Sequence, residues 1–130
     1  MSRSAVHTDR APKSKNPLSQ AVIHGGVVYC AGQGPLDPNT GEIVPGGIEA
    51  QTRQTFDNIR AVLAAAGTSL ADVLTVTCYL RKREDIAGFN AVYREVFTEP
   101  YPARSAFIVG DLFIDIDIEV VVTAALPSTA

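Results

Sequence analysis

The sequence predicts an α+β domain in which two amphipathic helices pack on one face of a mixed β-sheet, in the order ββαβαββ. Three observations predict this class. The chain has 130 residues, of which 46% are hydrophobic, and this suits one domain with a substantial core. Two segments repeat apolar residues at the helical period, and five segments rich in β-branched residues have strand character.

The first predicted elements are a β-hairpin and a helix. The segment QAVIHGGVVYCAG, residues 20–32, predicts two short strands about a Gly25-Gly26 turn. A loop rich in proline, asparagine and glycine follows over residues 33–47. Residues 47–66 place apolar side chains at helical spacing, and Gly67 is suited to end that helix.

A strand, a helix and two further strands complete the predicted order. Residues 71–82 alternate and are rich in β-branched side chains, so they predict a strand. Residues 83–97 return to the helical period, and Pro100 and Pro102 prevent the helix from continuing. Residues 103–109 and 116–126 predict the last two strands.

The second face of the predicted sheet has no cover from this chain, because both helices lie on the first. The side chains expected on that second face are largely apolar. We therefore expect the protein to self-associate through it, since large apolar surfaces of soluble proteins are normally buried.

The net charge of -3 is unevenly distributed along the chain. Residues 1–16 contain four basic side chains and one acidic one, so they carry +3 and the remainder sums to -6. We expect a basic, solvated N-terminal lead-in (1–16) followed by a single domain (17–130). An acidic domain is unsuited to a nucleic-acid groove, which needs a clustered basic face, so nucleic acid is not an expected partner.

The sequence also bears on location. It has no apolar run of about 18 residues, and its first residues lack the apolar centre of a signal peptide. We therefore expect no membrane span and no secretory signal, and the default expectation is a cytoplasmic protein.

The last predicted strand has two unlike faces. Alternate side chains point to opposite sides, so one face is wholly apolar from Ile114 to Ala124. The other face begins acidic, with Asp115 and Asp117, and ends apolar. Glu119 marks the transition, and is either a solvated edge residue or a functional carboxylate.

Arg104 is the second candidate functional residue. It begins a predicted strand after two prolines, where a guanidinium is suited to bind a planar anion through two hydrogen bonds. The simpler interpretation is a salt bridge to a neighbouring carboxylate. Arg104 and Glu119 lie in consecutive strands, however, and if those strands pair, the two groups could converge to bind a small carboxylate and transfer a proton beside it.

Other polar positions carry weaker signals. His7 and His24 lack the partners of a catalytic triad, and we interpret both as incidental. Cys30 and Cys78 lie in apolar, strand-like sequence with no metal-ligand spacing, so we expect buried thiols and no metal site. Asn90 interrupts the apolar face of its helix, and a packing or capping role is the simplest interpretation.

Five segments together resemble the RidA (YjgF) family of enamine and imine deaminases. They are GGVVYCAGQGPLDPNTGEIV, AQTRQTFDNIRAVLAAAG, FNAVYREVF, YPARSAF and IDIEVVVTAAL, in the family's order from about residue 20 to residue 127. The resemblance implies a chorismate-mutase-like ββαβαββ fold. It also implies a homotrimer, with the sheets facing inward and an active-site cleft at each subunit interface.

The resemblance also implies a role for individual residues. The arginine of the P-A-R-S motif, Arg104 here, would bind the substrate carboxylate, and the glutamate of the I-E motif, Glu119 here, would position and activate water. Gly32 of the G-Q motif and Ala106 would line the cleft largely through backbone groups. Asn90 matches a helix asparagine present in many members and would belong to the substrate-binding set.

Three positions depart from the best-known deaminases of this family. Leu18 stands where they carry a tyrosine, Ala31 where they carry a serine, and Ala106 where they carry a cysteine. The tyrosine and serine hydroxyls are thought to contact substrate, so their loss changes the polar part of the cleft.

The implied reaction is the cofactor-independent hydrolysis of 2-imino acids or their enamines, such as 2-iminopropanoate and 2-iminobutanoate, to 2-keto acids and ammonia. Three alternatives stay open. The same cleft could act on another carboxylate, such as an aminoacrylate or an aminomuconate, or the protein could bind a small carboxylate without turning it over. The ribonuclease or translation-inhibitor activity attached to some members is the third, and the acidic domain makes it the weakest.

Overall fold

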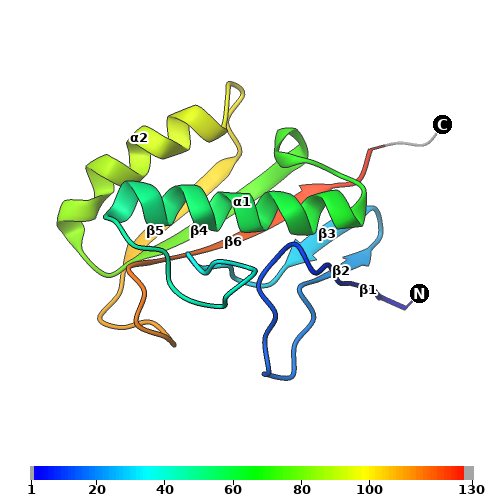
Figure 1. Cartoon of the computed structure of the whole chain (residues 1–130). Helices are drawn as coiled ribbons and strands as arrows, with labels where there is room; N and C mark the ends of the chain where they lie inside the picture. The colour runs from blue at the N-terminus through cyan, green and yellow to red at the C-terminus, as the bar shows by residue number, and fades with distance from the viewer. Residues whose placement is uncertain (1, 128–130) are drawn as a thin grey trace.

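The computed structural model describes residues 2–127, which form a six-stranded mixed sheet with both helices on one of its faces (Figure 1). The strands are β1 (Ser4–Val6), β2 (Ala21–His24), β3 (Val27–Cys30), β4 (Val73–Leu80), β5 (Ala103–Ile108) and β6 (Ile118–Ala125). They lie in the order β1-β2-β3-β6-β4-β5, and only β4 and β5 pair in parallel. The predicted ββαβαββ order is confirmed, with one strand added at its start.

That added strand, β1, differs from the solvated lead-in that we expected over residues 1–16. β1 pairs antiparallel with β2, and Val6 enters the core with 6% of its surface exposed. The Gln20 side chain secures the chain that follows, because its Nε2 donates to the carbonyls of Thr8 and Pro12 and its Oε1 accepts the Thr8 N–H. Three residues are too few for a recognisable strand pattern, so only pairing with β2 defines this element.

The hairpin between β2 and β3 matches its prediction. Gly25 and Gly26 have φ of 61° and 79°, the conformation of a two-residue turn that glycine adopts without steric cost. The pairing continues in register from Ala21 opposite Cys30 to His24 opposite Val27.

Both predicted helices form where the apolar period places them. Helix α1 (Ile48–Ala66) ends at Gly67, whose φ of 94° lets its N–H reach back to the last turn. Helix α2 (Ile86–Val96) follows a single 3₁₀ turn over Arg83–Asp85. Within the described part of the chain, no helix is both long and apolar enough to cross a membrane.

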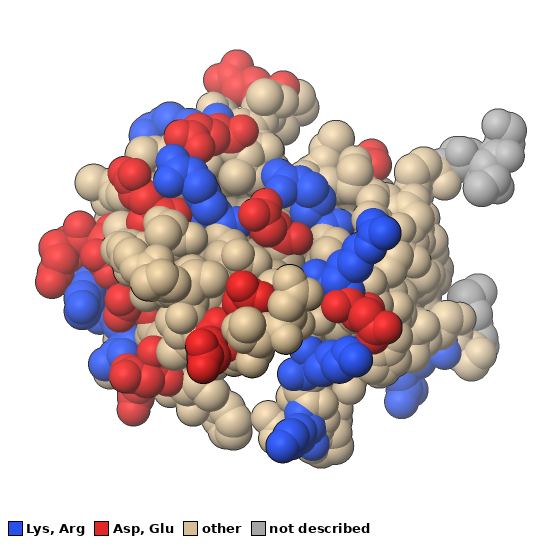
Figure 2. Space-filling view, in the orientation of Figure 1, with Lys and Arg blue, Asp and Glu red and all other residues tan. Residues whose placement is uncertain are grey.

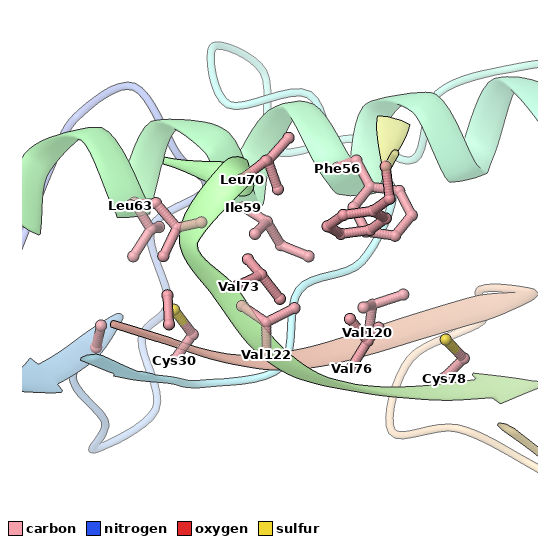
Figure 3. Close-up of a cluster of buried hydrophobic side chains, with 14 of the residues drawn as sticks. Cys30, Phe56, Ile59, Leu63, Leu70, Val73, Val76, Cys78, Val120 and Val122 are labelled. Atoms are coloured by element: carbon pink, nitrogen blue, oxygen red, sulfur yellow. The ribbon is translucent and has the colours of Figure 1, made fainter. Parts of the chain in front are cut away.

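The core lies between these helices and the sheet (Figure 3). Phe56 of α1 packs edge-on against Phe97, with ring centroids 5.5 Å apart, above the valines of β4 and β6. Cys30 and Cys78 are free, buried thiols, as expected. Burial raises the pKa of the Cys30 thiol to about 11 and that of the Cys78 thiol to about 12, so both stay protonated and unreactive.

Ile114 departs from the expected apolar face of the last strand. β6 begins only at Ile118, so Ile114 lies in the preceding loop with 39% of its surface exposed, whereas Ile116 is buried. In β4, a register shift between Val73 and Thr75 likewise interrupts the alternation and leaves Leu74 exposed.

The second face of the sheet is open in the protomer. Tyr79 of β4 stacks on Phe107 of β5 there, with ring centroids 6.0 Å apart, yet Phe107 remains 52% exposed. Tyr29 of β3 is 46% exposed. Aromatic rings arrayed on an uncovered sheet face are typical of a surface that pairs with another protein surface.

Asn58 of α1 ties the loop after β3 to the helical layer, and its loss should destabilise the fold. Its buried side chain donates to the carbonyls of Gly34 and Leu36 at 3.0 and 2.9 Å. Asn58→Ala leaves both carbonyls without their donor, so we expect the free energy of unfolding to fall by about 1–3 kcal/mol. Urea denaturation at one protein concentration measures it, with Asn39→Ala in an exposed turn as control. An effect no larger than that of the control would contradict this role.

Candidate functional site

Arg104 lies on the helical side of the sheet, at its β5 edge. β5 pairs Arg104 with the buried Val76 of β4, and paired residues point to the same side. The guanidinium lies over the Tyr93 ring, 4.7 Å from its centroid, and its Nη1 donates to Asn90 Oδ1 at 2.9 Å. Helix α2 therefore orients the guanidinium through one hydrogen bond and one aromatic contact, and these occupy only part of its five donors.

A cavity of about 270 Å³ adjoins this arginine. Its lining comes from α2 and from the segment leading into β5: Asn90, Tyr93, Arg94, Tyr101, Pro102 and Arg104. The Tyr93 hydroxyl is buried without a hydrogen-bond partner, and burial raises the pKa of this phenol to about 12. Two cationic groups beside an uncharged phenol suit the binding of an anion such as a carboxylate.

Glu119 lies on the opposite, open side of the sheet. β6 pairs it with Tyr79 of β4, one residue out of phase with the core-facing positions. Its carboxylate packs directly on Gly32, where an added Cβ would come within 2.9 Å of the Glu119 carboxyl carbon. A residue with a Cβ at this position would force the Glu119 side chain to move, so Gly32 allows the carboxylate its observed place.

Burial raises the pKa of the Glu119 carboxyl above its ordinary value. Burial is the cause of this shift within one protomer, where Arg104 lies on the other face of the sheet. A carboxyl with a raised pKa is better suited to exchange protons near neutral pH than a solvated one.

Glu119 lines a second cavity, of about 210 Å³, which we call the Glu119 cleft. The residues that line it come from the N-terminal segment, the loop after β3 and the loop before β6. They are Pro12, Lys13, Ser14, Asn16, Leu18, Gln20, Ala31, Gly32, Gln33, Gly34, Leu36, Phe113, Ile114, Ile116 and Glu119. The structure thus brings together four of the positions singled out from the sequence: Leu18, Ala31, Gly32 and Glu119.

The structure does not bring Arg104 and Glu119 together within one protomer. Their strands do not pair as the sequence analysis required, because β4 lies between β5 and β6. The register then places the two side chains on opposite faces of the sheet. Ala106 shares the Arg104 face, opposite Cys78, and lines neither cavity. One chain therefore carries two separate half-sites.

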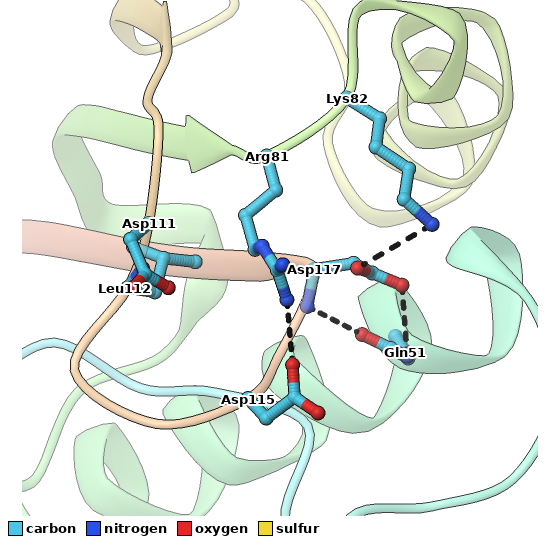
Figure 4. A network of polar contacts seen from close by, with 7 residues as sticks. All are labelled: Gln51, Arg81, Lys82, Asp111, Leu112, Asp115 and Asp117. Carbon is cyan, nitrogen blue, oxygen red and sulfur yellow. Dashed lines mark hydrogen bonds and ion pairs between the residues drawn. The ribbon is translucent and has the colours of Figure 1, made fainter.

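The loop before β6, residues 109–117, brings Phe113 and Ile114 to the Glu119 cleft, and the sequence analysis missed both. Polar contacts anchor its far end (Figure 4). Arg81 pairs with Asp115 at 2.7 Å, and Gln51 of α1 accepts the Asp117 N–H at 3.1 Å. The sequence pattern assigns Ile114 to the alternating face of the last strand, and Phe113 has no periodicity to interpret, so neither is expected at a cleft.

Charge is mixed over the helical face. Figure 2 shows basic and acidic side chains interspersed there, many of them paired, as Arg53 is with Glu95 and Arg60 with Asp57. Within residues 2–127, no group of three or more histidine, cysteine or acidic side chains is placed to hold a metal ion.

The sequence and the fold match a known family. The family model described as Endoribonuclease L-PSP matches residues 8–126. The chain is 49% identical over 118 residues to a RutC family protein of Pyrococcus horikoshii, covering 91% of this chain and 94% of that one. It is 38% identical over 118 residues to the 2-iminobutanoate/2-iminopropanoate deaminase of Escherichia coli, with coverage of 88% and 91%.

Solved structures agree with these sequence comparisons. Escherichia coli TdcF with bound serine superposes with a TM-score of 0.89 at 35% identity, covering 95% of this chain and 99% of that one. The architecture is thus that of small α+β proteins with the chorismate-mutase-like fold. The chain belongs to the RidA (YjgF) family within that class.

The raised pKa of Glu119 predicts a pH-dependent gain in stability for Glu119→Gln. A carboxyl whose folded-state pKa is raised favours folding below its unfolded pKa and loses that contribution as the pH rises through the folded value. Glutamine cannot ionise, so the variant should resist urea better than wild type at about pH 7, and the difference should vanish near about pH 4. Glu42→Gln, in an exposed turn, controls for net charge. A difference that does not vary with pH would contradict the assignment.

Proposed function

We propose that this protein hydrolyses 2-imino acids, or their enamine tautomers, to 2-keto acids and ammonia, at sites formed between the subunits of a homotrimer. One observation carries the proposal. An anion-binding half-site at Arg104 and a proton-exchanging half-site at Glu119 lie on opposite faces of one sheet, and each opens to the outside. Chemistry that needs both groups requires a second copy of the chain.

Arg104 would hold the substrate carboxylate. Asn90 occupies one donor of the guanidinium, and Tyr93 supports its flat face, so the arginine is pre-oriented. The free donors can bind both carboxylate oxygens of a 2-imino acid and place the adjacent imine carbon in a fixed position. Such positioning can contribute several kcal/mol to lowering the barrier.

Glu119 would accept a proton from water as the oxygen adds to the imine carbon. The C=N bond becomes a C–N bond in the resulting carbinolamine. Glu119 then returns the proton to nitrogen. The C–N bond breaks to release ammonia as the carbinolamine hydroxyl gives its proton to Glu119 and becomes the carbonyl of the 2-keto acid. The net change is the addition of one water and the release of one ammonia, so no oxidant or reductant takes part.

The homotrimer is supported by the open face of the sheet. Tyr29 and Phe107 each leave about half of their surface exposed there, and β5 is an edge strand with every residue exposed. Association of the open faces, turned inward, would bury these rings and carry Arg104 of one subunit toward Glu119 of the next.

A non-catalytic role is the second candidate, because TdcF has been crystallised with serine bound. In this case Arg104 would capture a small carboxylate and Glu119 would only complete the pocket. Another carboxylate substrate, of the aminoacrylate or aminomuconate type, would use the same groups. Binding without turnover supports the non-catalytic role, and a panel of substrates identifies a different carboxylate substrate. RNA cleavage, suggested by the family description, would require binding that weakens steeply with salt.

Substitution of Arg104 tests the carboxylate fork. With 2-iminobutanoate generated in situ by an amino-acid oxidase, we expect Arg104→Ala and Arg104→Lys each to lower kcat/KM for keto-acid release roughly 10- to 100-fold. An ammonium group keeps the charge but cannot reproduce the planar fork. Arg60→Ala, an exposed arginine of α1, is the matched control. Full activity in the lysine variant would refute two-bond recognition.

Mixing two inactive variants tests whether the site is shared. Arg104→Ala and Glu119→Gln each destroy one half-site, but a mixed trimer contains some interfaces with an intact arginine and an intact glutamate. Refolding equal amounts together should recover about one quarter of the wild-type activity, because half the subunits supply each group independently. Each variant refolded alone is the control. No recovery, with mixed trimers demonstrated, would place both groups in one subunit and refute the shared site.

A further inference from the structure

The Glu119 cleft has a strongly apolar wall. Leu18, Phe113, Ile114 and Ile116 line it, and we call these four residues the apolar wall. Phe113 is 85% exposed and Leu18 is 48% exposed in the protomer. Exposing a phenylalanine side chain forgoes the free energy gained by burying it, so a ring held at a cavity mouth indicates that something apolar binds there.

Several polar residues around the same cleft already have partners. Lys13 pairs with Asp9 at 3.2 Å, and Gln20 uses its amide on the backbone of Thr8 and Pro12. The Ser14 hydroxyl accepts the Asn16 N–H at 3.0 Å. These groups are therefore less available to a ligand than the side chains of the apolar wall.

The apolar wall is also anchored in place. Residues 109–117 are held at both ends, because the Val109 N–H donates to Leu80 and the Arg81 N–H donates to the Asp117 carbonyl. The Arg81–Asp115 and Gln51–Asp117 contacts (Figure 4) add two side-chain ties in the C-terminal half of this loop. An apolar surface on an anchored loop can discriminate by shape, whereas a free loop would adapt to any ligand.

We infer that the apolar wall receives the substrate's side chain, so that the preferred substrates are 2-imino acids with aliphatic side chains longer than that of alanine. The inference rests on the proposed function, since it assigns the remaining part of the same substrate. With the carboxylate on Arg104 of one subunit and the imine carbon at Glu119 of another, the side chain points into the Glu119 cleft. The cavity of about 210 Å³ equals roughly seven water volumes, which leaves room for a chain of several carbons.

A homologous series tests the inference. Imino acids made in situ from alanine, 2-aminobutyrate, norvaline and norleucine differ by one methylene at each step. We expect kcat/KM to rise about fourfold per methylene, the fold-change that corresponds to burying one CH₂. The 2-keto acids of the same chain lengths, titrated by calorimetry, should likewise bind more tightly with each added methylene, so their Kd should fall along the series.

Variants localise the effect. Phe113→Ser and Leu18→Ser should reduce the gain per methylene to less than about twofold, since each removes apolar contact surface from the wall. Both side chains are largely exposed, so the fold should tolerate the changes. Ile43→Ser removes an exposed apolar side chain that does not line the cleft, and it should keep the full gain.

The two readouts separate failure of this inference from failure of the proposed function. Turnover that does not rise with chain length, or keto-acid binding that is flat along the series, overturns the apolar-wall assignment and leaves the deaminase proposal intact. Absence of turnover with every imine in the series refutes the deaminase proposal. If keto-acid affinity still rises along the series and Phe113→Ser abolishes that rise, the apolar wall is supported as a binding site for aliphatic carboxylates.

Discussion

The position of β4 between β5 and β6 is the constraint on which the functional arrangement depends. Side chains alternate along a strand, and paired residues point to the same side, so two registers against β4 determine where Arg104 and Glu119 lie. Arg104 is in phase with Val76 and faces the helices, whereas Glu119 is in phase with Tyr79 and faces outward. A shift of one residue in either pairing would reverse one of these assignments and expose part of the core.

Each half-site has its own support. On the helical side, α2 supplies an amide acceptor and an aromatic face to the guanidinium, so one helix sets the arginine's orientation. On the open side, the Glu119 carboxylate lies on the bare backbone of Gly32, and its burial raises its pKa. These surroundings suit the two proposed roles, since an anion-binding group has to stay charged while a proton-exchanging group has to change its charge. Separation on two faces lets each environment be set independently.

The loop before β6 connects the helical layer and the sheet to the Glu119 cleft. Gln51 reaches from α1 to Asp117, and Arg81 reaches from the end of β4 to Asp115. The helical layer thereby positions apolar residues that lie beside Glu119 on the other face of the sheet. The same sheet face remains open in the protomer, so the surface proposed for assembly adjoins the cleft proposed for the substrate.

The sequence by itself determined the order of the main elements, the Gly25-Gly26 turn, the end of α1 at Gly67 and the identity of the two functional candidates, because each of these depends on local periodicity or on the conformational freedom of glycine. Only the tertiary structure decided which strands pair. That choice depends on contacts between residues far apart in the chain, and it separates Arg104 from Glu119. It also added β1, whose three residues form a strand only beside β2, and it brought Phe113 from a loop without periodicity to the Glu119 cleft.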